Sequence, residues 1–132
     1  MNSNFCSISI YLYGNSISLE SVSTMLGLAP TRSRNRGDLR VTSSGSEVVQ
    51  KIGFWEYRVK VNVDKVSSSL IGLMDLVKCD RLVGHAGIEK AELDIFVPFD
   101  SEGTENGFSM ELPSDFLARL SKLGVDLVIT SR

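Results

Sequence analysis

Apolar and polar side chains alternate along several stretches of the chain. In residues 5–13 (FCSISIYLY), Cys6, Ile8 and Leu12 fall on one face, and serine and tyrosine side chains fall on the other. A period of two is typical of a strand with one face in the core and one face in water. The stretches that show this pattern are 5–13, 54–63, 91–99 and 125–131, and a shorter strand is expected at 108–112.

Three other stretches carry apolar residues three or four positions apart, as one face of a helix does. Ser18 is placed to cap the start of the first of them, and Gly27 is placed to cap its end. Asp64 is predicted to cap the start of the second, and Gly124 is predicted to close the third. The helices are therefore predicted between Ser18 and Gly27, from Asp64 to about Lys78, and from Pro113 to Gly124.

Residues 29–52 interrupt this regular pattern and are predicted to form an irregular, basic loop. Within it, residues 40–42 and 47–50 could pair as a ragged hairpin around Gly45, because glycine with serine and threonine neighbours is typical of a turn. A different interruption, Pro98, cannot donate a ladder hydrogen bond. The strand that contains it should therefore end at an edge or leave the sheet there.

The order of these elements predicts the fold class. Strands and helices follow one another without the strict alternation of a parallel sheet, and 132 residues fit one domain with a core of its own. We therefore predict a single α+β domain over residues 1–132. Its sheet is mainly antiparallel, with about five strands and two to three helices packed on it.

Composition narrows the range of partners. Hydrophobic residues make up 42% of the chain and charged residues 23%, with a net charge of -2. A protein that grips phosphate backbones is usually basic, so the balance argues against nucleic acid. No stretch approaches the roughly 18 apolar residues that span a bilayer, so no membrane is expected. Two cysteines, Cys6 and Cys79, and the lack of a leader-like N-terminus predict a cytoplasmic protein with reduced thiols.

The charge is unevenly distributed and suggests two candidate binding surfaces. Residues 32–65 carry a net charge of about +4 and residues 89–115 about -7. In the basic segment, an extended backbone would put alternating arginines on one side. The candidates for contact with a partner are Arg32, Arg34 and Arg36 in the basic segment, and Asp100, Glu102 and Glu105 in the acidic one.

Catalytic signatures are weak. His85 is the only histidine, and it would have to meet Cys79 in space for a Cys–His nucleophile. The acidic stretch 100–107 lacks the ligand spacing of a calcium-binding loop, and glycine-rich phosphate loops and serine elbows are missing from the sequence. The sequence therefore predicts a protein that is not an enzyme and that needs no metal ion and no cofactor.

One string of residues resembles a known family. The segment MLGLAPTRSRNRGD (25–38), followed by GFWEYRV (53–59), resembles the bacterial domain-of-unknown-function family 4279. The residues that form the common framework are Gly27, Pro30, Gly37, Asp38 and Trp55. The resemblance implies a small α+β domain without established catalytic residues. Some members resemble immunity proteins of polymorphic-toxin and contact-dependent inhibition systems, which neutralise a cognate toxin domain by direct binding in the cytosol.

We therefore expect an immunity protein whose partner is a toxin domain. The acidic loop would dock on a basic toxin and is slightly preferred, because its local charge is larger; the arginines would dock on an acidic one. The alternative is a small ligand-binding or regulatory module whose arginine-rich loop holds an anion.

Overall fold

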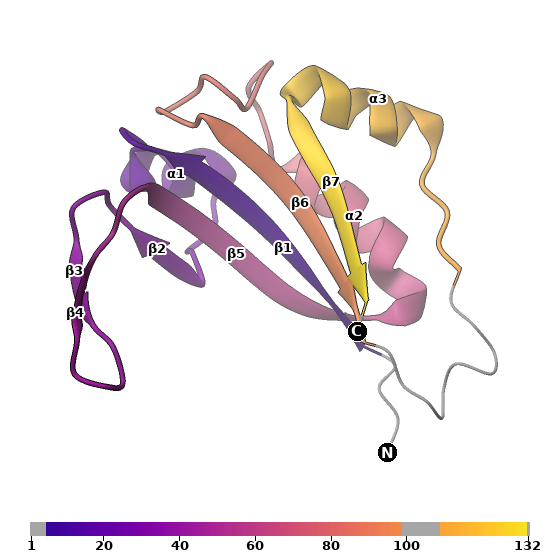
Figure 1. Cartoon of the computed structure of the whole chain (residues 1–132). Helices are drawn as coiled ribbons and strands as arrows, with labels where there is room; N and C mark the ends of the chain where they lie inside the picture. The colour runs from indigo at the N-terminus through magenta and orange to yellow at the C-terminus, as the bar shows by residue number, and fades with distance from the viewer. Residues whose placement is uncertain (1–4, 99–108, 132) are drawn as a thin grey trace.

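Five strands of the protein form one twisted sheet with helices along one of its faces, and two short strands form a separate hairpin (Figure 1). The computed structural model describes residues 5–98 and 109–131. In chain order the elements are β1 (Phe5–Gly14), α1 (Leu19–Leu26), β2 (Arg32–Arg34), β3 (Leu39–Val41), β4 (Glu47–Val49), β5 (Gly53–Asn62), the 3-10 helix η1 (Val63–Lys65), α2 (Val66–Asp75), β6 (Lys90–Val97), α3 (Ser114–Leu123) and β7 (Val125–Ser131).

The described part of the chain confirms the predicted fold class. The main sheet has five strands in the order β2-β5-β1-β6-β7, and every neighbouring pair is antiparallel except β6 and β7. These two are parallel because α3 lies between them in the chain and returns it to the same end of the sheet. No helix within the described ranges combines the length and the apolar character that crossing a membrane requires.

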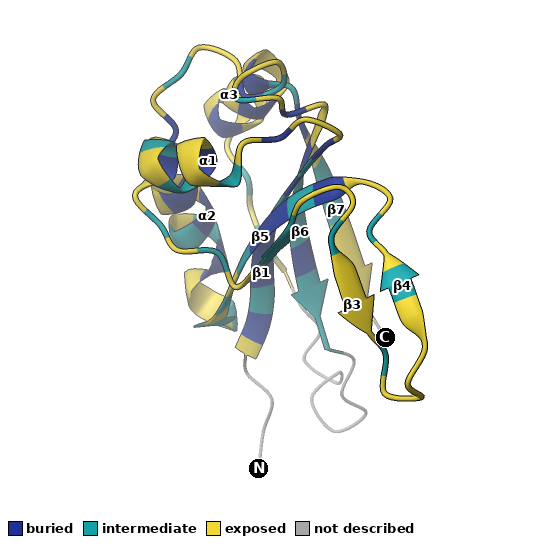
Figure 2. Cartoon of the chain, turned by 90° about the vertical axis from the view of Figure 1, so that its left-hand side faces the viewer, coloured by how far each residue is buried: buried dark blue, intermediate teal, exposed yellow. Residues whose placement is uncertain are grey.

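The core lies between the sheet and the three helices. The side chains of Ile8, Leu12 and Leu93 are 0% exposed, as the alternation in their strands predicted. Trp55 is equally buried, and its indole nitrogen donates a 2.9 Å hydrogen bond to the hydroxyl of Ser23, which attaches α1 to β5. Figure 2 shows buried positions concentrated on the side of the sheet that the helices cover. The opposite side is open.

Three of the predicted helix boundaries are confirmed, and the two bounds predicted for the second helix are wrong. Ser18 accepts a hydrogen bond from the backbone of α1, and Gly27 and Gly124 both end their helices in the left-handed conformation. Asp64 does not cap α2, because it lies within η1, and the helix starts at Val66 and stops at Asp75. β5 ends at Asn62, one residue earlier than predicted, and the three residues that follow form the 3-10 turn that leads from the sheet into α2.

The short strand expected at 108–112 is absent from its described residues, 109–112. Met110 and Leu112 pack against the core without backbone pairing, and Ser67 donates a 2.8 Å hydrogen bond to the carbonyl of Glu111. The apolar spacing of this segment therefore reflects attachment to the helix layer instead of membership of the sheet.

The basic segment 29–52 is more ordered than the sequence predicts. Its first part, β2, pairs with β5 and becomes the edge of the main sheet. Its second part is the predicted hairpin, with β3 paired to β4 and Gly45 at a φ of 89° in the turn. In Figure 2 the hairpin stands on the open side of the sheet, opposite the helices.

Two glycines should respond in opposite directions to the same substitution. Gly27 has a φ of 68°, and the space where an added methyl group would lie is open. The only effect of Gly27→Ala is therefore backbone strain, which should lower the free energy of unfolding by about 1 kcal/mol. Gly72, inside α2, also has open space around it, but its backbone is helical. Gly72→Ala should therefore raise the free energy of unfolding by about 0.5–1 kcal/mol. Urea unfolding of both variants checks the pair, and equal effects would contradict the assigned cap.

Candidate binding face

The side of the sheet away from the helices, here called the open face, is where the polar positions of the strands meet. Cross-strand pairing brings Ser9 beside Arg58 on one side and Asp94 on the other, and it places Tyr11 between Glu56 and Glu92. The edge strand β2 adds two arginines, since Arg32 lies opposite Glu56 and Arg34 opposite Phe54. The open face therefore joins residues from β2, β5, β1 and β6 in one surface.

A buried carboxylate lies at the centre of this face. The side chain of Glu56 is 1% exposed, although the alternation in its strand predicted a wet position. Its Oε1 accepts a 2.7 Å hydrogen bond from Arg32 Nε, and its Oε2 forms a 2.9 Å ion pair with Arg58 Nη2. The two arginine side chains are about half exposed and cover the carboxylate. Glu56 is thus buried by its own counter-ions.

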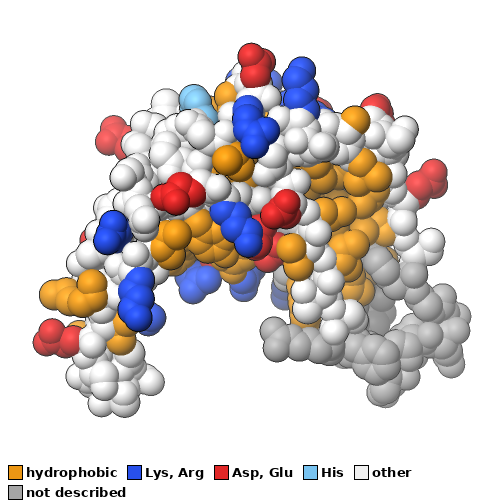
Figure 3. All heavy atoms as spheres, turned by 45° about the horizontal axis from the view of Figure 1, so that its top comes forward, with side chains coloured by type: hydrophobic (Ala, Val, Ile, Leu, Met, Phe, Trp, Pro, Cys, Tyr) orange, Lys and Arg blue, Asp and Glu red, His pale blue; other side chains and the backbone are white. Residues whose placement is uncertain are grey.

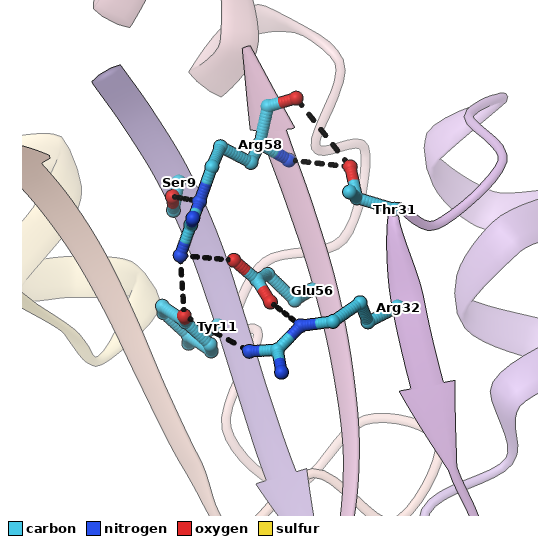
Figure 4. Close-up of polar contacts among 6 residues, drawn as sticks. All are labelled: Ser9, Tyr11, Thr31, Arg32, Glu56 and Arg58. Carbon is cyan, nitrogen blue, oxygen red and sulfur yellow. Dashed lines mark hydrogen bonds and ion pairs between the residues drawn. The ribbon is translucent and has the colours of Figure 1, made fainter. Parts of the chain in front are cut away.

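Further hydrogen bonds hold the two arginines in place (Figure 4). The hydroxyl of Tyr11 accepts from Arg58 Nη2 at 3.0 Å and from Arg32 Nη2 at 3.5 Å. Arg58 Nε also donates to the hydroxyl of Ser9 at 3.2 Å. The hydrogen bond to Glu56 raises the pKa of Arg32, which keeps this side chain charged. We call Ser9, Tyr11, Arg32, Glu56 and Arg58 the Glu56 network.

The open face is hollowed beside this network. A hollow of about 840 Å³ has the rings of Tyr13 and Phe54 in its lining, with Arg34 from β2 and Arg40 from the hairpin. A second hollow, of about 350 Å³, extends across β6 to Thr130 of β7. Both are lined by Tyr11 and Asp94, so the two hollows are neighbours on the open face, and together they are here called the groove. Figure 3 shows the hairpin standing away from the body, with a hollow and basic side chains beside it.

Aromatic rings stiffen the lining of the groove. The rings of Tyr11 and Tyr13 are stacked, with centroids 5.8 Å apart and planes 3° from parallel. The guanidinium of Arg32 lies 5.5 Å from the centre of the Phe54 ring, within the range of a cation–π interaction. These contacts leave the rings with few alternative rotamers, so the groove is formed before any partner arrives.

Two buried side-chain atoms of the described residues accept no hydrogen bond, Glu56 Oε2 and Asp94 Oδ1. Glu56 Oε2 still has its ion pair with Arg58, whereas no described residue pairs with Oδ1 of Asp94. Burial raises the pKa of Asp94, and the nearby charges of Glu92 and Glu56 add to the effect, against an opposing influence of Arg58 and Lys90. Those two basic groups are already paired with Glu56 and Glu92 respectively. Buried polar atoms without partners are rare in native proteins and call for an explanation.

Comparison with known proteins gives one match. The family described as Domain of unknown function (DUF4279) matches residues 4–131, nearly the whole chain. The chain belongs to this family. No curated protein and no solved structure matches the chain. The resemblance that the sequence suggested is therefore confirmed at the level of the family.

The structure places the framework residues of this DUF4279 chain around the arginine segment. Gly37 donates a 2.8 Å backbone hydrogen bond to Gln50, and Gln50 donates one to Asp38, so these residues start the hairpin. Pro30 precedes Thr31, whose backbone donates to the carbonyl of Glu56 at 2.7 Å. Gly27 ends α1, and Trp55 attaches this helix to β5 through its hydrogen bond to Ser23. The framework residues thus hold the two ends of the segment that carries β2, β3 and β4.

The three arginines proposed from the DUF4279 sequence do not share one side. Arg32 and Arg34 lie on the open face, but Arg36 is exposed in a turn and lines neither hollow. The extended backbone stops at Arg34, because Asp38 Oδ2 accepts a 2.8 Å hydrogen bond from the backbone of Asn35 and the chain turns. The acidic candidates Asp100, Glu102 and Glu105 lie outside the described residues.

Sequence reasoning missed most of the open face of this DUF4279 domain. Tyr11, Tyr13, Phe54, Glu56 and Asp94 were placed on strands, but no role was assigned to them. A signal was present, since three large aromatic residues stand at positions where the alternation predicts a water-facing side chain. Aromatic residues on the wet face of a sheet are a common mark of a binding surface.

The ion pairs of Glu56 can be tested by removing charges in two steps. The double variant Arg32→Met and Arg58→Met leaves a buried carboxylate without a counter-ion and should lower the free energy of unfolding by about 3–5 kcal/mol. Adding Glu56→Gln to that variant should restore part of the loss, because the uncompensated charge disappears. Arg36→Ala, at an exposed turn, is the control and should change stability by no more than about 0.5 kcal/mol. A triple variant less stable than the double one would contradict the interpretation.

Proposed function

We propose that this DUF4279 protein acts by binding a protein partner with its open face, and that the partner is a bacterial toxin domain which it neutralises. The observation that carries the proposal is the groove of the open face, which no described helix covers and which arginine and aromatic side chains line. These are the residue types that contribute most to binding at protein interfaces.

Charge supports an acidic contact on the partner. Arg34 and Arg40 both line the larger hollow, and neither has an ion-pair partner among the described residues. In contrast, the positive charge of Arg32 and Arg58 is partly offset by Glu56. The uncompensated positive charge therefore lies at the end of the groove nearest the hairpin. Of the two surfaces expected from the sequence, the arginine surface is the one that this arrangement favours.

The chemistry of the face supports binding without catalysis. The Glu56 side chain is 1% exposed and lies beneath Arg32 and Arg58, so a substrate in the groove does not reach its carboxylate. His85 and Cys79, the candidates for nucleophilic chemistry, line neither hollow of the groove. We therefore propose a role in which the partner is occluded and is not chemically changed.

An immunity role fits a surface of this kind. A toxin must be held tightly from the first encounter, and affinity rises when the binding side chains are already ordered. The Glu56 network orders Arg32 and Arg58, and stacking orders Tyr11 and Tyr13. The resemblance of some family members to immunity proteins points the same way. The cytoplasm is the proposed location, and the free thiols of Cys6 and Cys79 are compatible with it.

Charge reversal on the open face tests the proposal. The protein should co-purify with the toxin domain encoded beside its gene and should rescue growth when the two are co-expressed. Arg34→Glu combined with Arg40→Glu should weaken binding about 100-fold or more, as expected when two hot-spot residues repel their partner.

The matched control is Lys65→Glu with Lys122→Glu. This variant changes the net charge by the same amount as the arginine variant, but at exposed positions of the helix layer. It should leave binding and rescue intact. Failure of the unaltered protein to bind or rescue would refute the immunity role, and equal losses in both double variants would refute the assignment of the face.

A second candidate function is an anion-binding module, which the unpaired Arg34 and Arg40 in one hollow favour. A small anion at 100 times its dissociation constant should then stabilise the protein by about 2.7 kcal/mol. A thermal-shift series with phosphate, sulfate and citrate measures this stabilisation. The double variant Arg34→Ala with Arg40→Ala should abolish the stabilisation. A shift with the toxin domain but with none of the anions would reject this candidate.

A further inference from the structure

We infer that the groove of the open face recognises an extended segment of the partner protein that carries one acidic and one basic side chain. The acidic group binds Arg34 and Arg40, and the basic group binds the carboxylate of Asp94. This inference rests on the proposed function, since it names the chemistry by which the open face would select its partner.

The shape of the groove allows such a segment to lie across the strands. The larger hollow begins at Arg40 of the hairpin and reaches Asp94 on β6, while the smaller one continues from Asp94 to Thr130 on β7. The path therefore crosses β5, β1 and β6, whose neighbours in a sheet are about 4.8 Å apart. Along β6, Asp94 also lies four residues from Lys90, which stands in the cross-strand row of Arg34. At the backbone the two ends are therefore about 20 Å apart, which suits roughly six extended residues.

The arginine end provides donors that the protein itself does not use. Among the described residues, Arg34 and Arg40 make no ion pair and no side-chain hydrogen bond. Two guanidinium groups beside one hollow favour a carboxylate, because a guanidinium binds the two oxygens of a carboxylate side by side. The rings of Tyr13 and Phe54 stand in the same cross-strand row as Arg34, and they offer apolar surface to the stems of the bound side chains.

Asp94 supplies the opposite requirement. Its buried Oδ1 has no donor within the described chain, and the two basic groups that act on it are committed to other carboxylates. A buried, unpaired carboxylate oxygen destabilises the folded protein. Such a local conflict is expected where a residue serves binding instead of stability. A basic side chain of the partner that enters the groove would pair with the carboxylate of Asp94 and compensate its charge.

A peptide panel tests the charge pattern without the toxin. Four peptides of equal length would carry an acidic and a basic residue, the acidic residue alone, the basic residue alone, or neither. Measured by fluorescence polarisation, the mixed peptide should bind about tenfold more tightly than either single-charge peptide. A tenfold difference in affinity corresponds to the one charge-assisted hydrogen bond that each single-charge peptide lacks. Equal affinity for all four peptides would overturn the inference.

Two variants assign each charge to its residues. Asp94→Asn should abolish the advantage of the basic residue and keep that of the acidic one, whereas Arg34→Ala with Arg40→Ala should do the reverse. Asp94→Asn should also unfold at the same or a higher urea concentration than the unaltered protein, because no internal partner is lost. A marked loss of stability would show that Asp94 has a structural partner and would overturn its assignment.

The same variants distinguish this inference from the proposed function. If the mixed peptide binds as expected but the toxin domain does not, the immunity role fails and the chemistry of the groove stands. If the toxin domain binds, and Asp94→Asn and the arginine variant leave that binding unchanged, the proposed function stands and the inference is wrong.

Discussion

The need to pair a buried carboxylate with opposite charge governs how the open face is built. Glu56 is inaccessible to water, and without counter-ions its burial would cost several kcal/mol, on the order of 3–5. Arg32 provides one counter-ion from the edge strand β2, so the ion pair also attaches that strand to the sheet. Arg58 provides the other and extends the network to β1 through Ser9 and Tyr11. One polar residue thereby coordinates three strands on a face that has no hydrophobic cover.

The open face divides its charged groups into two kinds. The Glu56 network is satisfied internally and contributes rigidity. Arg34, Arg40 and Asp94 line the adjoining groove and have no partner within the described residues. The first set fixes the geometry, and the second set retains the capacity to bind. Because the Glu56 network lies directly beside the unpaired groups, a partner would meet Tyr11, Arg32 and Arg58 in positions that hydrogen bonds already hold, which reduces the entropy that binding costs there.

The sequence predicts the fold better than it predicts the binding surface. The period of the apolar positions shows which face of the sheet a side chain occupies, but it does not show how far that side chain is buried. Alternation identifies β1, β5, β6 and β7, and left-handed glycines mark the ends of α1 and α3. The alternation assigns Glu56 to the correct face of the sheet but does not predict its burial. Two arginines from separate strands, Arg32 and Arg58, bury it. β2 escapes prediction for a related reason: its sequence, RSR, has no apolar pattern, and its pairing depends on Glu56 and Thr31. Asp64 does not cap α2 because residues 63–65 form a 3-10 turn ahead of the helix.

The hairpin of β3 and β4 determines how large an interface the open face can support. A stable protein complex buries about 800 Å² on each partner, which exceeds what a groove of this kind offers alone. The hairpin adds to it from both of its sides. Arg40 and Gln50 line the larger hollow, while the opposite side exposes Leu39, Val41 and Val49 to 65%, 70% and 53%. Because an isolated two-stranded hairpin is marginally stable in water, a partner that enters the groove and also covers this apolar side would stabilise the hairpin. Recognition in the groove and ordering of the hairpin would then reinforce each other.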